Sequence, residues 1–175
     1  MRIAIHWFGD VPFIVLKELA MDLRIFNVAT EIGKVLPVPP EAYNKEKDQF
    51  IADVLLALAS AQDGDKVLCV ASFDIYTKPL NFVFGEAEVG GRGAVISIAR
   101  LGDENNRLFR ERVAKEAIHE LGHTLGLNHC PDTACVMHYS TELADTDFKK
   151  GIYCANCSSK IPISWRPKQM SPGSC

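Results

Sequence analysis

Hydrophobic and polar positions follow two periods along the first part of the chain. Residues 2–9 combine β-branched and aromatic side chains and stop at a Gly-Asp pair, which predicts an opening strand. Residues 12–26 have apolar positions at helical spacing, and Pro12 suits a first helical turn. Residues 28–38 predict a second strand, which a cluster of prolines ends.

The middle of the chain continues this order. Residues 41–61 predict a long amphipathic helix, and residues 66–76 a buried strand. Residues 81–89 and 93–101 predict two more strands, separated by a glycine-rich turn. Strands that alternate with helices and then follow one another predict an α/β (α+β) fold, a mixed twisted sheet with helices packed on it.

One more helix is expected to begin near Asn105 or Asn106 as its cap and to run through Leu125. Its apolar stripe lies roughly opposite His119 and His123, so one side should pack on the sheet while the other faces a cleft. The stripe consists of Ala114, Ile118, Leu121 and Leu125.

Length, composition and charge limit the function classes. The chain has 175 residues, of which 47% are hydrophobic, enough for one domain with a single core. A net charge of -3 and no run of Lys or Arg give no electrostatic case for nucleic acid or membrane partners. Neither of these partners is therefore expected, and we expect a monomer.

The compartment follows from the N-terminus and the cysteines. The first ten residues are too short for a signal peptide, and no apolar run is long enough to span a membrane. We therefore expect a cytoplasmic protein. In a reducing compartment, six cysteines are better interpreted as metal ligands than as disulfides.

The segment HELGHTLGLNH, residues 119–129, carries the chemistry of the chain. On a helix, His119 and His123 lie about 5–6 Å apart at Cβ, close enough to share one metal ion. The glycine at 126 lets the chain leave the helix, which could bring His129 back as a third ligand. Three imidazoles with an open fourth position describe a catalytic zinc site. Incidental histidines on a solvated helix face explain the spacing poorly.

Glu120 is rotated about 100° from His119 around the helix. It is therefore poorly placed as a metal ligand but well placed to reach a water molecule on the same metal. Arg112 and Glu116 share this face of the helix and are expected to form a surface ion pair, with a role towards substrate as the alternative.

Four cysteines after the histidines have the spacing of a second metal site. Cys130 and Cys135 form one pair, and Cys154 and Cys157 another, a pattern typical of four-cysteine zinc. Because side chains alternate in an extended segment, residue 129 could face one metal and residue 130 another. Two disulfides, an iron–sulfur cluster and a thioredoxin-type pair are the alternatives.

Two cysteines lie outside this pattern. Cys69 lies in an apolar strand and is expected in the core, while Cys175 is terminal and is assigned no role.

The motif HELGHTLGLNHC, with CVM at 135–137 and CANC at 154–157, resembles the archaemetzincin family of zinc metallopeptidases in the metzincin clan. The resemblance implies two zinc ions per chain, and Met137 as the residue of a turn beneath the site. The catalytic zinc would be held by His119, His123 and His129, and the structural zinc by Cys130, Cys135, Cys154 and Cys157.

The resemblance also bears on two further features. Without it, Met137 would be interpreted as an ordinary core residue. Tyr139 follows in a short run that astacins share, where the tyrosine can approach the metal; a packing role is the preferred interpretation here. Many metzincins carry a propeptide, whereas the first strand predicted here begins at Met1 and leaves no room for one.

We therefore expect one metzincin-like catalytic domain, 1–175. An N-terminal subdomain, 1–129, would border the cleft opposite a small irregular zinc-stabilised subdomain, 130–163, with a loose tail at 164–175. The expected reaction is peptide-bond hydrolysis by a zinc-activated water, with Glu120 as general base and substrate extended along the strand at 81–89. The alternatives are a zinc-stabilised binding module without turnover and a hydrolase of non-peptide amides.

Overall fold

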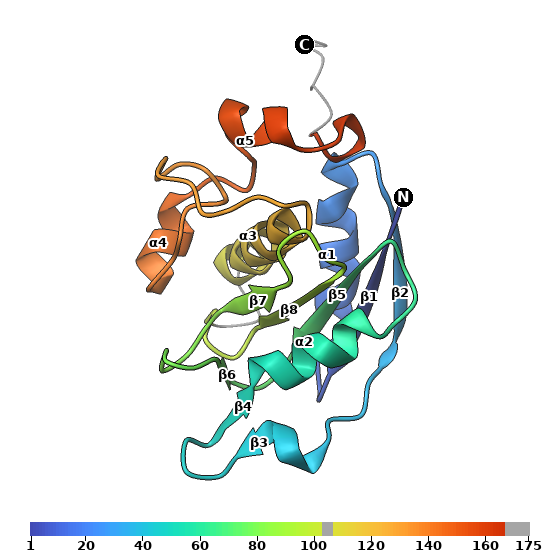
Figure 1. Cartoon of the computed structure of the whole chain (residues 1–175), viewed down its shortest axis with the longest axis vertical. Coiled ribbons are helices and arrows are strands. Elements are labelled where there is room, and N and C mark those ends of the chain that lie inside the picture. The colour runs from blue at the N-terminus through green and yellow to red at the C-terminus, as the bar shows by residue number, and fades with distance from the viewer. Residues whose placement is uncertain (103–106, 167–175) are drawn as a thin grey trace.

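The computed structural model describes residues 1–102 and 107–166. A five-stranded sheet with the order β2-β1-β5-β8-β7 forms its centre (Figure 1). Neighbouring strands pair in parallel except β7, which is antiparallel to β8 at one edge. The mixed sheet predicted from the sequence is therefore confirmed. The strands are β1 (Arg2–Phe8), β2 (Ala29–Val35), β5 (Lys66–Ala71), β7 (Gly85–Ala87) and β8 (Gly93–Ser97).

Helices cover both faces of this sheet because its central strands are apolar on both sides. On β5, Leu68 and Val70 face α1 (Phe13–Asp22) and α3 (Arg107–Thr124), while Val67 and Cys69 face α2 (Ala52–Ser60). Figure 1 shows α2 in front of the sheet and the other two helices behind it. Cys69 is fully buried, as expected. A 3-10 turn, Leu23–Ile25, extends α1.

The long helix predicted at 41–61 is wrong in its first half. This stretch forms a 3-10 turn at Pro40–Ala42, then β3 (Tyr43–Asn44) and β4 (Gln49–Ile51), and only then enters α2. The Phe50 ring lies 3.8 Å from that of Phe73 between ring centroids, so packing from a distant segment outweighs local helical periodicity.

The strand predicted at 66–76 is two strands. Its last residues form β6 (Ile75–Tyr76), which pairs with β4 in a second sheet of order β3-β4-β6. The chain turns between these two strands near Asp74. This carboxylate accepts hydrogen bonds from Gln49 at 2.8 Å and from Arg100 at 2.6 Å.

The C-terminal segment packs on the same core as the N-terminal part. It contains α4 (Leu143–Phe148), α5 (Ala155–Lys160) and a 3-10 turn, Ile163–Trp165. Trp165 is fully buried, and its ring centroid lies 5.8 Å from that of Phe26. The loose tail expected from residue 164 is therefore wrong for 164–166, while 167–175 lie outside the described residues.

Helix α3 is buried on nearly every side. Its expected cap, Asn105 or Asn106, lies outside the described residues. The predicted surface pair of Arg112 and Glu116 does not form, since both residues are buried. Arg112 instead makes two hydrogen bonds of 2.7 Å to Asp147 in α4, because the C-terminal segment covers this face. None of the described helices is long and apolar enough to cross a membrane.

Candidate active site

The end of α3 turns the chain back towards the helix. Gly126 adopts φ of 88°, and its N–H donates to the carbonyl of His123 at 2.8 Å. The next N–H, of Leu127, donates to the carbonyl of Gly122 at 3.1 Å, which completes a Schellman motif. This turn brings His129 alongside the two helical histidines, as the glycine predicted.

Three imidazoles converge at this point. Their ligand nitrogens lie within 4.8 Å of one another. Nδ1 of His119 lies 2.8 Å from the carbonyl oxygen of Val136, and Nδ1 of His123 lies 2.7 Å from that of Leu127. Both Nδ1 atoms must therefore carry the proton, which leaves both Nε2 atoms with lone pairs.

The two Nε2 atoms of His119 and His123 face each other at 3.1 Å. Two lone-pair acceptors at this distance repel, so this contact is not a hydrogen bond between neutral rings. A cation between them removes the repulsion, and backbone carbonyls that fix the ring tautomer are a regular feature of metal-bound histidines. The donor set therefore fits a metal such as zinc.

Burial keeps these imidazoles neutral, the form in which they bind metal. Desolvation lowers the pKa of His119 well below its ordinary value, and the charge of Lys149 lowers it further. Burial likewise lowers the pKa of His123 and of His129, which is the more exposed of the three.

Glu120 lies beside the edge strand β7. A Cβ atom at Gly85 would lie 2.6 Å from Glu120 Cγ, so only glycine allows the strand and the carboxylate to approach this closely. Burial raises the pKa of Glu120 well above its ordinary value, the neighbouring charge of Glu116 raises it further, and Lys149 opposes the shift.

A cleft of about 470 Å³ opens beside Glu120 and the three histidines. One wall is the segment 80–89 with the edge strand, and the opposite wall is Tyr139–Thr141. The three histidines and Glu120 line the cleft between them. The sequence prediction that the segment 81–89 forms a strand beside the site is thus confirmed for Gly85–Ala87.

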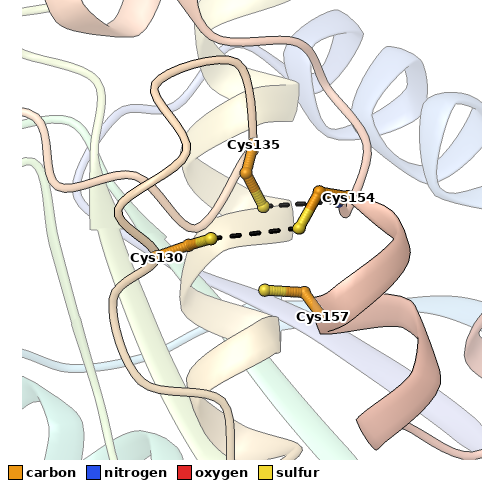
Figure 2. A group of neighbouring side chains, drawn as sticks. All are labelled: Cys130, Cys135, Cys154 and Cys157. Atoms are coloured by element: carbon orange, nitrogen blue, oxygen red, sulfur yellow. Dashed lines mark hydrogen bonds between the residues drawn. The ribbon is translucent and has the colours of Figure 1, made fainter.

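The four cysteines form a separate cluster. Figure 2 shows their sulfur atoms pointing towards a common centre, two from the loop after α3 and two from the start of α5. Their ligand atoms lie within 4.8 Å of one another. His129 belongs to one group and Cys130 to the other, as the alternation of side chains predicted.

The cluster does not contain disulfides. Cys130 Sγ and Cys154 Sγ lie 3.9 Å apart, against about 2.05 Å in a disulfide, and all four thiols are free. Burial raises the pKa of Cys135 and of Cys157, whereas backbone hydrogen bonding lowers the pKa of Cys154. A bound cation favours the thiolate form, so this donor set also fits a zinc ion.

Comparison with known proteins decides the family. The family model described as peptidase family M54 matches residues 41–162. The chain belongs to this family. Archaemetzincin from Natronomonas pharaonis is 36% identical over 172 residues, which cover 92% of this chain and 99% of that protein. Archaemetzincin from Methanopyrus kandleri is 47% identical over 126 residues, 71% of this chain and 72% of that protein.

Solved structures agree with this membership. The crystal structure of archaemetzincin from Archaeoglobus fulgidus, complexed with malonate, matches with a TM-score of 0.86 at 40% identity, covering 92% of this chain and 100% of that one. The Methanopyrus kandleri structure matches with a TM-score of 0.84 at 38% identity, covering 91% of this chain and 92% of that one. The chain is a zinc metallopeptidase of the archaemetzincin type, as the motif predicted.

Met137 and Tyr139, the two residues that the family resemblance pointed out, both lie close to the site. Met137 is fully buried, and a Cβ atom at Gly122 would clash with its sulfur, so the methionine packs directly against α3. Tyr139 is 43% exposed, and its ring centroid lies 4.7 Å from that of His129. It therefore lies on the cleft wall beside a candidate metal ligand.

Two residues of this M54 site were missed from sequence. Gly85 is one of 12 glycines, and nothing in its local pattern indicates that it faces the glutamate. Lys149 lies in a polar run typical of a surface, yet it is fully buried behind the site. Each residue is positioned by a partner more than thirty positions away in the sequence, so no local sequence signal could have identified it.

Proposed function

We propose that His119, His123 and His129 hold the catalytic zinc of this peptidase and that Glu120 is its general base. The facing Nε2 atoms of two rings, whose Nδ1 atoms are both committed to carbonyl oxygens, carry this proposal. Bound zinc supplies Lewis acidity, which activates water for attack and polarises a substrate carbonyl.

The carboxylate of Glu120 is suited to accept and return a proton. It lines the cleft, and burial raises its pKa above that of an exposed glutamate. A general base works best when its pKa is near the working pH, and the same group can then protonate the leaving amine.

Substrate is proposed to lie extended along β7. This strand is the edge of the sheet, so its outer N–H and C=O groups can pair with a peptide backbone. Gly85 and Ala87 point to the α3 side of the sheet, on which Glu120 lies, so a peptide paired there would pass beside the carboxylate. A peptide bond is thereby favoured over a non-peptide amide.

Cys130, Cys135, Cys154 and Cys157 are proposed to hold a second, structural zinc, which gives two zinc ions per chain. Four protein ligands leave no open position, which is the arrangement of structural sites. Four free thiols at this distance are stable only where disulfides do not form, so we propose a cytoplasmic location. One catalytic domain working as a monomer is sufficient for this function.

Glu120→Gln tests the catalytic assignment. Glutamine is nearly isosteric and leaves the imidazoles in place, but its amide cannot accept the proton from water. The variant should keep its zinc and its melting temperature, while peptide turnover falls by at least about 10⁴-fold. Glu111→Gln makes the same change on the same helix outside the cleft and should leave turnover unchanged.

The measurement is cleavage of a diverse peptide library by the zinc-loaded protein, with zinc content determined alongside. A wild type without turnover that still captures peptides would indicate a binding module. Glu120→Gln activity above about a tenth of wild type would disprove the general-base role.

A further inference from the structure

Glu86 is a carboxylate of the cleft that has no part in the proposed chemistry. It lies on the edge strand β7 and lines the cleft. The two other carboxylates among the described lining residues are engaged, since Glu116 lies 3.0 Å from the ammonium nitrogen of Lys149 and Glu120 is the proposed general base. Oε2 of Glu86, by contrast, is buried and makes no hydrogen bond to any described residue. A buried carboxylate oxygen without a partner costs free energy, which a cationic group bound in the cleft would offset.

The register of β7 places Glu86 on the opposite face of the sheet from the general base. Glu86 pairs with Val95 of β8, whose side chain packs in the core on the α2 side. The preceding residue, Gly85, pairs with Ile96, which belongs to the core on the α3 side. Glu86 and Glu120 nevertheless line the same cleft, so this cleft extends across the edge of the sheet.

The groups around Glu86 favour a cation at this end of the cleft. No Lys or Arg is among the described residues that line the cleft. Asp53, in the first turn of α2, accepts a hydrogen bond of 3.0 Å from Thr77, which lines the cleft together with Glu86. Burial and the charge of Asp53 together raise the pKa of Glu86 to about 7, although the hydroxyl of Thr77 opposes the shift. A positive group beside Glu86 would stabilise its ionised form.

A peptide paired with β7 would bring one of its side chains to Glu86. Directly opposed residues on neighbouring strands have their side chains on the same face of the sheet, about 4.5–5.5 Å apart at Cβ. The peptide residue opposite Glu86 would therefore point to the α2 side, and the residue opposite Gly85 would lie beside Glu120. Because consecutive Cα atoms are about 3.8 Å apart, the side chain that meets Glu86 belongs to a residue within about two positions of the scissile bond.

We propose that Glu86 determines substrate specificity by selecting a lysine or arginine side chain at that position of the peptide. This inference rests on the proposed function, and in particular on a substrate that lies along β7. Lysine and arginine carry their charge on a long apolar stem, which can pack along the strand while the charged end reaches the carboxylate. Glu86 is partly buried, so solvent screens the pair less than it screens a pair on the open surface.

The experiment uses quenched-fluorescent peptides of one sequence, in which a single residue is either lysine or methionine and is moved along the peptide. The zinc-loaded full chain should cleave the lysine peptide with a kcat/KM at least about tenfold above that of the methionine peptide at one position. That position should lie within about two residues of the cleaved bond. Methionine is the comparison because it has a stem of similar length without the charge.

Glu86→Gln removes the charge of the carboxylate and nearly keeps its shape. The kcat/KM for the preferred lysine peptide should fall at least about tenfold, while that for the methionine peptide should stay within about twofold of wild type. The melting temperature should not fall, because the change removes a buried carboxylate oxygen without a partner. Glu88→Gln is the matched control: Glu88 lies two residues further along the chain, exposed and outside the cleft, and its variant should keep the preference for lysine.

Two results would overturn the specificity of Glu86. One is a wild type that cleaves peptides without preferring lysine at any position. The other is an equal loss for both peptides in Glu86→Gln, which would show that the residue acts on the catalytic centre or the fold. If the wild type cleaves none of the peptides, the proposed function fails separately, and the affinities of the same peptides decide the inference. Lysine should then strengthen binding to the wild type at least about tenfold at one position and give no advantage in Glu86→Gln, and any other pattern would reject it.

Discussion

At the residue scale, close approaches in this site depend on the absence of a side chain. Gly85 lets β7 approach Glu120, and Gly122 lets Met137 pack against α3. At both positions a methyl group would lie closer to a neighbour than real Cβ atoms do. The two glycines therefore fix the distance between the sheet edge, the helix and the residues below it.

Gly85→Ala should impair catalysis more than stability. The added methyl must push the Glu120 side chain aside, because the atoms it would meet are Cγ, Oε1 and Cδ of that flexible group. A misplaced general base forfeits much of the roughly 10²–10⁴-fold that proton transfer contributes. We expect a fall in kcat of at least about tenfold with zinc content unchanged. Gly151→Ala, where a methyl would meet only Lys115 Cγ at 3.8 Å, is the control. Normal turnover by Gly85→Ala would contradict this account of the contact.

At the element scale, the histidine cluster and the cysteine cluster differ in the secondary structure that carries them. Two of the histidines lie near the end of an 18-residue helix that already packs on the sheet, and the third follows the turn after it. The cysteines instead join a loop to α5, which has six residues, too few to be stable alone. The cysteine cluster should therefore contribute more to folding than the histidine cluster.

Cys154→Ser should lower the melting temperature far more than His123→Ala. In closed structural sites, metal binding is coupled to folding and contributes on the order of 10 kcal/mol in small zinc peptides. Thermal unfolding of both variants, with Cys69→Ala as a cysteine substitution away from the cluster, measures the difference. Equal losses in the two variants, or a larger loss in His123→Ala, would argue against a structural cysteine site.

At the scale of the whole molecule, one hydrophobic core joins the two metal groups. Buried residues of β1, α1 and α3 pack in the same cluster as Cys135, Tyr153 and Trp165 from the C-terminal segment. Residues on both sides of the expected division at residue 129 therefore share one core.

Two zinc ions per chain should be found by elemental analysis of protein kept away from chelators. The two ligand sets have no residue in common, so each should fill independently. His123→Ala and Cys154→Ser should each retain one zinc ion. Wild-type protein with a single zinc ion, or with iron and visible absorption, would exclude the two-zinc assignment.

The sequence by itself predicted the family of this protein, its class of activity and the strands of its central sheet. Helical spacing and one glycine turn bring the three histidines together, and short loops bring the members of each cysteine pair together. Both arrangements are therefore encoded within a few residues. The central strands and α1 follow from periodicity for the same reason.

Only the tertiary structure decided what depends on distant partners. The Phe50–Phe73 contact converted the start of a predicted helix into strands, and Trp165 ordered part of an expected tail. Arg112, Glu116 and Lys149 have side chains typical of a surface, and they are buried only because α3 and the C-terminal segment pack against each other. Burial is set by the packing of whole elements, which local residue patterns do not specify.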